Sequence, residues 1–246
     1  MGVETAEVSL LGDREDNQDR SAIMASGDRT FCAVLDGMGG HAEGAQAAEV
    51  AVDSLRRSFE TSGQAADPEA FLRGALEQAH REVVGIGDDL PAAARPRATV
   101  AVFLVDGDRA TWGHVGDARV YHFRDGKVLS RTRDHTPVEQ LVRDGLITEA
   151  DIPGHPLRHY VEYCLGGFSE LPDISVAELT PLEPGDVLLA CSDGLWSGVD
   201  DEALAATAGD AADLDGWLAR QAGRAIRATM PYSDNTTAIA LRITED

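Results

Sequence analysis

The stretch FCAVLDGMGGHAEG, residues 31–44, joins a strand-like pattern to a helix-like pattern through a glycine-rich turn. Its five apolar residues, 31–35, predict a buried strand, and helical sequence begins near Ala42. Between them, Asp36 enters a turn that is rich in glycine at positions 37–40. A carboxylate beside glycines, which let backbone carbonyls approach a ligand closely, suits a metal ion or a phosphate. Taken alone, the stretch is explained more simply as an ordinary turn, in which Asp and Gly are common.

Strands are predicted before this stretch and amphipathic helices after it. Apolar residues at Val8 to Leu11 and at Ser21 to Ala25 flank the charged run GDREDNQD, residues 12–19, and predict two strands separated by a turn. Apolar residues then recur at helical spacing over 48–59 and again over 72–83. Two helices therefore follow the first strands.

The rest of the chain returns to strand patterns. Asp-Gly pairs at 106–107 and 125–126 are typical of hairpin turns. Thr136 begins a capping box for a short helix, and polar sequence continues to His159, where we expect a mobile surface segment. A helical pattern over 214–226 precedes the last strand. The expected strands span residues 98–105, 110–115, 119–123, 127–130, 160–165, 174–179, 187–191 and 236–243.

The order of these elements indicates the fold class. Strands come in meandering groups, and helices are bunched after the first group and near the end instead of alternating with the strands. We therefore expect an α+β fold of mostly antiparallel sheet covered by helices. A chain of 246 residues is most simply organised as one domain, residues 1–246.

The composition excludes several classes of protein. A formal charge of −22, from 43 acidic and 21 basic residues, opposes binding to nucleic acid or to an acidic membrane surface. No apolar stretch approaches the ~20 residues of a membrane span, and none resembles a signal peptide. The three cysteines are odd in number and widely spaced, which indicates buried thiols in a reducing compartment. We expect a cytoplasmic protein that binds neither nucleic acid nor membrane.

Five aspartates recur at strand ends. Asp36, Asp117 and Asp193 each follow a predicted strand beside a glycine, whereas Asp19 and Asp234 each precede one. If those strands are neighbours, the five carboxylates converge on one edge. Like charges a few ångströms apart cost several kcal/mol outside bulk water, so convergence indicates a bound cation. Judged singly, each Asp is better explained as a turn or cap residue.

The type of donor selects the ion. Oxygen ligands favour Mg²⁺ or Mn²⁺ over zinc or copper, and the 7 histidines show no zinc-ligand spacing. Two such ions sharing a carboxylate would lower the pKa of a bridging water and clamp a phosphoryl oxygen. Arg14, close to this cluster in sequence, could hold a phosphate bidentately, although an arginine judged alone is more often a surface ion pair.

Seven motifs run nearly from end to end of the chain: GDREDNQD at 12–19, VLDGMGGH at 34–41, GHVGDARVY at 113–121, RTRDH at 131–135, CLGG at 164–167, GDVLLACSDGLW at 185–196 and SDNTTAIAL at 233–241. Each motif is weak alone, whereas seven in this order are specific. Together they resemble the PPM family, the metal-dependent (type 2C) serine/threonine protein phosphatases, in its bacterial form.

This resemblance implies a β-sandwich flanked by helices on both faces, with a binuclear Mn²⁺/Mg²⁺ centre at one end. In such proteins Asp36 would bridge the two ions, and Gly37 would offer its backbone carbonyl to one of them. Asp193 and Asp234 would complete the coordination of the other ion, and Asp19 would lie near that ion, partly through water. The binuclear centre is thus expected from five residues on four separate segments.

The resemblance also implies features around that centre. A third, weaker metal site would use Asp117 with Asp193, and Arg14 matches the phosphate-binding arginine of the family. Residues at about 137–160 correspond to a variable flap that is thought to shape substrate access, and we call them the flap segment. Together with the centre, these features describe a site for a phosphorylated substrate.

Two positions depart from the pattern of many relatives. Met38 replaces the histidine suggested as general acid in some of them, and His41, which follows the glycines, is at least as well explained as a surface residue. The proton donor to the leaving group is therefore unassigned. Gln18 stands where many relatives have Glu, which is expected to lower metal affinity without abolishing activity.

The function implied by the resemblance is hydrolysis of phosphoserine and phosphothreonine in proteins by a metal-activated water, with Arg14 and Asp36 as catalytic residues and no phosphoenzyme. The expected partners are phosphorylated proteins and a bacterial kinase that the enzyme opposes, and we expect a monomer. The alternative is a pseudophosphatase that binds a phosphoprotein without turnover, which we rank lower because the metal ligands are all present. A third reading, an acidic solubility or metal-buffering module, explains the charge but not the ordered motifs.

Overall fold

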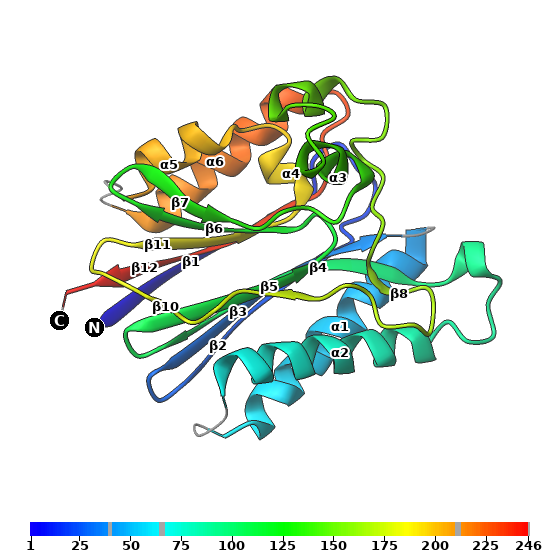
Figure 1. Cartoon of the computed structure of the whole chain (residues 1–246), viewed down its shortest axis with the longest axis horizontal. Coiled ribbons are helices and arrows are strands. Elements are labelled where there is room, and N and C mark those ends of the chain that lie inside the picture. Colours follow the sequence, from blue (N-terminus) through cyan, green and yellow to red (C-terminus); the bar gives the residue numbers. More distant parts are fainter. Residues whose placement is uncertain (39–40, 64–66, 210–212, 246) are drawn as a thin grey trace.

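Two antiparallel sheets form the centre of the computed structural model, which describes residues 1–38, 41–63, 67–209 and 213–245 (Figure 1). The strand order of the first sheet is β1-β12-β11-β6-β7. The first and last strands of the chain pair along their length, from Gly2 opposite Thr244 to Leu10 opposite Thr236. These strands are β1 (Gly2–Leu10), β12 (Thr236–Thr244), β11 (Val187–Cys191), β6 (Arg119–Arg124) and β7 (Lys127–Arg131).

The second sheet has the strand order β10-β5-β4-β3-β2, with β8 beside β4 and β9 beside β5. Its central strands β3 and β4 are buried almost throughout, because both faces of this sheet are covered. They accordingly have continuous apolar sequences instead of alternating ones. The strands are β2 (Asp19–Ser26), β3 (Arg29–Met38), β4 (Arg97–Asp106), β5 (Arg109–Val115), β8 (Leu165–Gly166), β9 (Ser175–Val176) and β10 (Thr180–Pro181).

Helices cover the outer face of each sheet (Figure 1). The helices α1 (His41–Thr61) and α2 (Pro68–Gly85) pack on the second sheet. The first sheet is covered by α4 (Asp193–Trp196), α5 (Asp201–Ala208) and α6 (Leu214–Thr229). The predicted fold class, an α+β sandwich with helices on both faces, is therefore confirmed. The remaining helices are α3 (Pro137–Arg143) and the 3₁₀ turns η1 (Ala92–Ala94) and η2 (Glu149–Gly154).

The apolar side chains form three layers, one between the sheets and one between each sheet and the helices that cover it. Phe31 and Leu76 belong to the layer between α1, α2 and the second sheet. Phe103 and Leu188 lie between the two sheets, and Trp217 lies between α6 and the first sheet. Successive residues of β3 alternate between two of these layers, as the period of a strand requires.

Local signals in the sequence account for several element boundaries. Asp67 caps α2 by accepting a hydrogen bond from the Ala70 amide at 2.9 Å, and Thr136 caps α3 by accepting one from Glu139. The predicted hairpin turn between β6 and β7 is confirmed, since Asp125 has a left-handed backbone with φ 51° before its glycine. The predicted helices over 48–59, 72–83 and 214–226 are likewise confirmed.

Other expectations were wrong. The strand predicted over 160–165 is reduced to the two residues of β8, and that predicted over 174–179 to β9. The segment 160–163 carries exposed aromatic side chains, so its apolar content reflects surface and not core. The strand predicted over 31–35 is longer than expected. It is part of β3, which continues to Met38 and includes Asp36 and Gly37. The short elements α4, α5, η2 and β10 were not predicted.

The expectations for the cysteines and for membrane-spanning segments can be compared with the structure. Cys32 and Cys191 are buried free thiols, whereas Cys164 is only partly buried. None of the described helices combines the length and the apolar character needed to cross a bilayer.

Candidate metal centre

The strand ends that carry the five aspartates lie at the end of the sandwich away from both termini, which Figure 1 marks N and C. Asp19 begins β2 and pairs in register with Asp36 near the end of β3. Asp193 follows β11, Asp234 precedes β12 and Asp117 follows β5. Antiparallel neighbours bring a strand start beside a strand end, which is why residues before and after strands meet at one edge.

The charges of these aspartates act on one another. Burial raises the pKa of Asp36 well above its usual value, and Asp19, Asp193, Asp117 and Asp234 raise it further. Burial and its carboxylate neighbours likewise raise the pKa of Asp193 well above the usual value. Burial also raises the pKa of Asp19 to about 6 and that of Asp117 to about 7. Each of these four groups is therefore costly to keep ionised without a cation.

Two observations test whether these residues fit a metal ion. The Oδ1 atoms of Asp19 and Asp193 are buried and have no hydrogen-bond partner among the described residues. A buried carboxylate oxygen without a donor is unfavourable unless a cation takes the place of the donor. The all-oxygen donor set is the type that Mg²⁺ and Mn²⁺ prefer. The residues therefore fit a hard divalent cation.

The side chains alone do not form a complete coordination sphere. Within residues 1–38, 41–63, 67–209 and 213–245, no three His, Cys, Asp or Glu side chains are placed as a ready cluster around one metal ion. Mg²⁺ in proteins keeps several waters as ligands. An ion held at this edge would therefore complete its coordination with water.

The glycines beside Asp36 and Asp193 are required by packing. A Cβ on Gly37 would lie 2.1 Å from the backbone oxygen of Gly44 in α1. A Cβ on Gly194 would lie 2.0 Å from the backbone oxygen of Asn235. The sequence pattern Asp-Gly thus marks two places where the backbone of another segment lies close to the residue that follows the carboxylate.

Two residues that sequence reasoning missed hold this edge together. The Ser192 hydroxyl donates to Asp19 Oδ2 at 2.8 Å, which connects the first sheet to the second. The Asn235 side chain donates to the backbone oxygens of Leu11 and Asp16 and accepts from the Gln18 amide. Both residues stand next to predicted ligands in the motifs SDG and SDN, which was the available signal.

Arg14 lies at the rim of the centre. Its guanidinium donates to Asp234 Oδ2 at 2.6 Å, and its side chain is 58% exposed. The adjacent Asp13 accepts hydrogen bonds from the amide and the hydroxyl of Ser233, so the loop that carries Arg14 is fastened to the loop before β12. The arginine is thereby placed where it faces both solvent and an acidic group of the centre.

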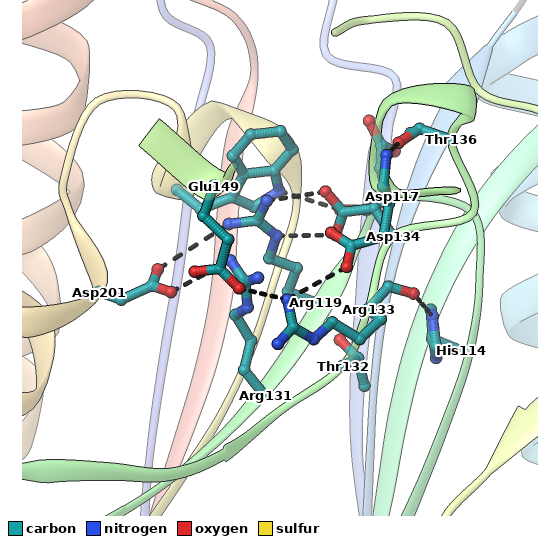
Figure 2. A network of polar contacts seen from close by, with 12 residues as sticks. His114, Asp117, Arg119, Arg131, Thr132, Arg133, Asp134, Thr136, Glu149 and Asp201 are labelled. Carbon is teal, nitrogen blue, oxygen red and sulfur yellow. Dashed lines mark hydrogen bonds and ion pairs between the residues drawn. The ribbon is translucent and has the colours of Figure 1, made fainter. Parts of the chain in front are cut away.

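The flap segment is attached beside Asp117 (Figure 2). The guanidinium of Arg133 bonds to Glu139 in α3 at 3.1 Å and to Glu149 in η2 at 2.5 Å. The next residue, Asp134, raises the pKa of Asp117, after burial, by its negative charge. The predicted flap segment thus contains a helix and a 3₁₀ turn that are joined by one arginine to the neighbourhood of Asp117.

The described residues next to Asp36 in sequence offer no new candidate for the group that protonates the leaving group. Met38 ends β3 and is half-buried, and it has no group that ionises. The side chain of His41, the other residue considered, lies outside the described residues.

Comparison with known proteins identifies the family. A sequence profile described as protein phosphatase 2C matches residues 9–224. The chain belongs to the protein phosphatase 2C family. This membership confirms the predicted resemblance and the predicted class of enzyme, a protein phosphatase.

Relatives within the family are bacterial. The chain is 31% identical over 202 residues to a serine/threonine phosphatase, stp, of Listeria monocytogenes, covering 76% of this chain and 75% of that protein. It is 30% identical over 205 residues to the serine/threonine protein phosphatase PstP of Mycobacterium tuberculosis, covering 81% of this chain but only 39% of that longer protein.

A solved structure agrees over the whole fold. The catalytic domain of the serine/threonine protein phosphatase PstP in complex with two manganese ions has a TM-score of 0.81 and 27% identity, covering 99% of both chains. The two folds therefore match over nearly the full length of both chains.

Proposed function

We propose that this chain hydrolyses phosphoserine and phosphothreonine in proteins, using Mn²⁺ or Mg²⁺ held at a two-ion centre. The observation that supports this most strongly is the pair of buried, unpartnered oxygens on Asp19 and Asp193, which lie at the edge that also carries Arg14. A cation satisfies the first two groups, and a phosphate suits the third.

Each residue of the centre has a role in this proposal. Asp36 would hold both ions, and the Gly37 carbonyl would hold one of them. Asp193 and Asp234 would hold the other ion, with Asp19 near it through water. The pKa directions at Asp36 and Asp193 support these roles, because two carboxylates that are costly to ionise alone become favourable ligands beside a divalent charge.

The reaction depends on both the ions and the chain. When bound, the ions supply a water of lowered pKa and neutralise charge on the phosphoryl oxygens. Arg14 exchanges its ion pair with Asp234 for a bidentate contact with the phosphate, and its exposed position leaves room for this change. The flap segment borders the approach to the centre and shapes the access of the substrate. Asp117, with Asp193, would hold a third and weaker ion.

The wider setting is proposed on the same basis. Residues 1–246 act as one phosphatase domain with a flap segment at about 137–160. The substrates are phosphorylated proteins of the cytoplasm, the enzyme opposes a serine/threonine kinase, and it acts as a monomer. The relatives named serine/threonine phosphatase support the substrate class. A binding-only pseudophosphatase is not favoured, because every predicted ligand position carries a residue able to bind the ion.

The test is turnover of a phosphothreonine peptide with and without added Mn²⁺. The expected result is hydrolysis that requires the ion and is lost in Asp36→Asn and in Asp193→Asn. Asp53→Asn is the matched control, since Asp53 is a half-exposed aspartate of α1 paired only with Arg56 among the described contacts. Failure of the purified protein to hydrolyse phosphopeptides or an aryl phosphate with Mn²⁺ would overturn the proposal.

A further inference from the structure

We propose that Arg119, Asp134 and Trp196 form a brace that holds Asp117 at a set position relative to Asp193. The proposal rests on the proposed function, because it concerns the third metal site that these two aspartates would share. It assigns positioning roles to three residues that do not themselves bind the ion.

The first part of the brace is a buried ion pair. Arg119 lies on β6 with 6% of its surface exposed. Its Nε donates to Asp134 Oδ1 at 2.8 Å and its Nη2 to Asp134 Oδ2 at 2.7 Å (Figure 2). A third donor, Nη1, bonds to the Tyr121 hydroxyl at 3.1 Å. A bidentate pair with a further hydrogen bond leaves the guanidinium plane a single orientation.

The second part is the indole of Trp196. The Arg119 guanidinium carbon lies 3.7 Å from the centre of this ring, so the fixed plane of the arginine fixes the plane of the indole. The indole N–H donates to the backbone oxygen of Asp117 at 2.9 Å. The chain of contacts thus runs from Asp134 through Arg119 and Trp196 to Asp117.

The position of Trp196 connects its hydrogen bond with Asp117 to the location of Asp193. Asp193 is the first residue of the four-residue helix α4 and Trp196 is the last. One hydrogen bond therefore joins the short helix that begins with Asp193 to the backbone of Asp117. Changes in this bond alter the separation of the two carboxylates, which is the quantity that an ion bound between them requires to be constant.

Arg119 and Trp196 would make the same contacts if they only stabilised the fold. The test must therefore measure the affinity of the metal site. Trp196→Phe removes the N–H donor but keeps an aromatic ring against Arg119. Trp217→Phe is the matched control. The Trp217 indole in α6 also donates one 2.9 Å hydrogen bond, to Thr207 in α5, and neither residue has a proposed metal role.

Calorimetric titration with Mn²⁺ is the main experiment. We expect Trp196→Phe to weaken the lowest-affinity site about tenfold, the site that Asp117→Asn abolishes, and to leave the tighter sites unchanged. Trp217→Phe should give the wild-type isotherm. Identical isotherms for the two tryptophan variants would overturn the brace. A wild-type protein that binds no Mn²⁺, or whose binding survives Asp36→Asn, would instead overturn the proposed function.

A second measurement covers the case in which Trp196→Phe does not fold. The chain has three tryptophans, and their ¹⁹F signals after 5-fluorotryptophan labelling are assigned with Trp112→Phe and Trp217→Phe. We expect the Trp196 signal of the wild-type protein to shift as Mg²⁺ fills its weakest site, and to stay in place in Asp117→Asn. A Trp196 signal that does not respond to that site contradicts the brace.

Discussion

The hydroxyl of Ser192, directly after β11, donates to the carboxylate of Asp19, at the start of β2, and so joins the two sheets by a 2.8 Å hydrogen bond at the edge that carries the five aspartates. The other oxygen of Asp19 has no partner among the described residues. One side of this carboxylate is therefore oriented by the fold, while the other side is left for a ligand.

Ser192→Ala should weaken Mn²⁺ binding about tenfold, because the carboxylate of Asp19 loses the group that orients it. The variant also leaves the Thr237 amide without its side-chain acceptor, which is expected to cost about 1–3 kcal/mol of stability. Calorimetry and urea unfolding measure the two effects. Ser54→Ala, at a buried serine of α1, is the control, and an equal Mn²⁺ affinity in both variants contradicts the prediction.

Mn²⁺ should stabilise the folded protein, because the fold assembles the ligands from distant segments. At 100 times its dissociation constant, a single bound ion adds about 2.7 kcal/mol to the free energy of unfolding. Thermal unfolding with and without the ion tests this, and EDTA should reverse the shift. In Asp36→Asn the shift should disappear, whereas Asp53→Asn should keep it. A melting temperature independent of Mn²⁺ counts against the metal centre.

Arg14→Ala should lower kcat/KM for a phosphopeptide about 10- to 100-fold, the size expected for loss of hydrogen bonds to a charged group of about 1.5–3 kcal/mol. Arg14→Lys should recover only part of this, since an ammonium lacks the bidentate geometry. Arg56→Ala, at an exposed arginine of α1, should leave the steady-state kinetics unchanged. Equal rates for Arg14→Ala and Arg56→Ala would exclude a role in phosphate binding.

Gly194→Ala should destabilise the protein by about 1–3 kcal/mol or more, because the new Cβ would lie 2.0 Å from the Asn235 backbone oxygen. Since that backbone leads into Asp234 and β12, Mn²⁺ affinity should fall as well. Gly74→Ala is the control: this glycine in α2 has open space around it, and alanine there should stabilise by about 0.5–1 kcal/mol. Urea unfolding of both variants checks the opposite signs.

His135 should make the protein less stable in acid. Burial and the neighbouring His114 lower its pKa to about 4, with Arg143 acting in the same direction and Asp134 and Asp173 opposing. Between pH 6.5 and 4 the unfolded state therefore binds the proton and the folded state does not, so stability falls as the pH falls through this window.

The magnitude is about 1–2 kcal/mol at pH 5 relative to pH 7. His135→Gln should remove this part of the pH dependence. Unfolding free energies of the variant and the wild type, compared at each pH, isolate it from the aspartates, whose effects cancel in the difference. A difference that does not change between pH 7 and 5 contradicts the prediction.

Sequence reasoning could predict the gathering of the aspartates for a physical reason. A buried strand leaves its polar residues at its ends, and antiparallel pairing places the start of β2 beside the end of β3. Asp19 and Asp36 are thus brought together by register alone. The individual roles as ligands came from the family resemblance and stay proposals.

The supporting contacts could not be predicted in the same way. Glycine is required at 194 because the backbone oxygen of Asn235, 41 residues further along the chain, lies too close for a Cβ. No local sequence pattern reveals a contact between such distant segments. The strand expected over 160–165 failed because Tyr160 and Tyr163 are exposed, and strand propensity alone does not distinguish surface aromatics from core ones. The brace from Arg119 to Trp196 likewise depends on side chains far apart in sequence.

The pairing of β1 with β12 has a consequence for the synthesis of the protein. Asp234, Asn235 and β12 are translated after the other described strands, yet they fasten the loop of Arg14 and stand next to β11, which leads to Asp193. A nascent chain that has released everything up to β11 still lacks this wall of the centre. We therefore expect the edge that carries the five aspartates to assemble only after β12 has been translated.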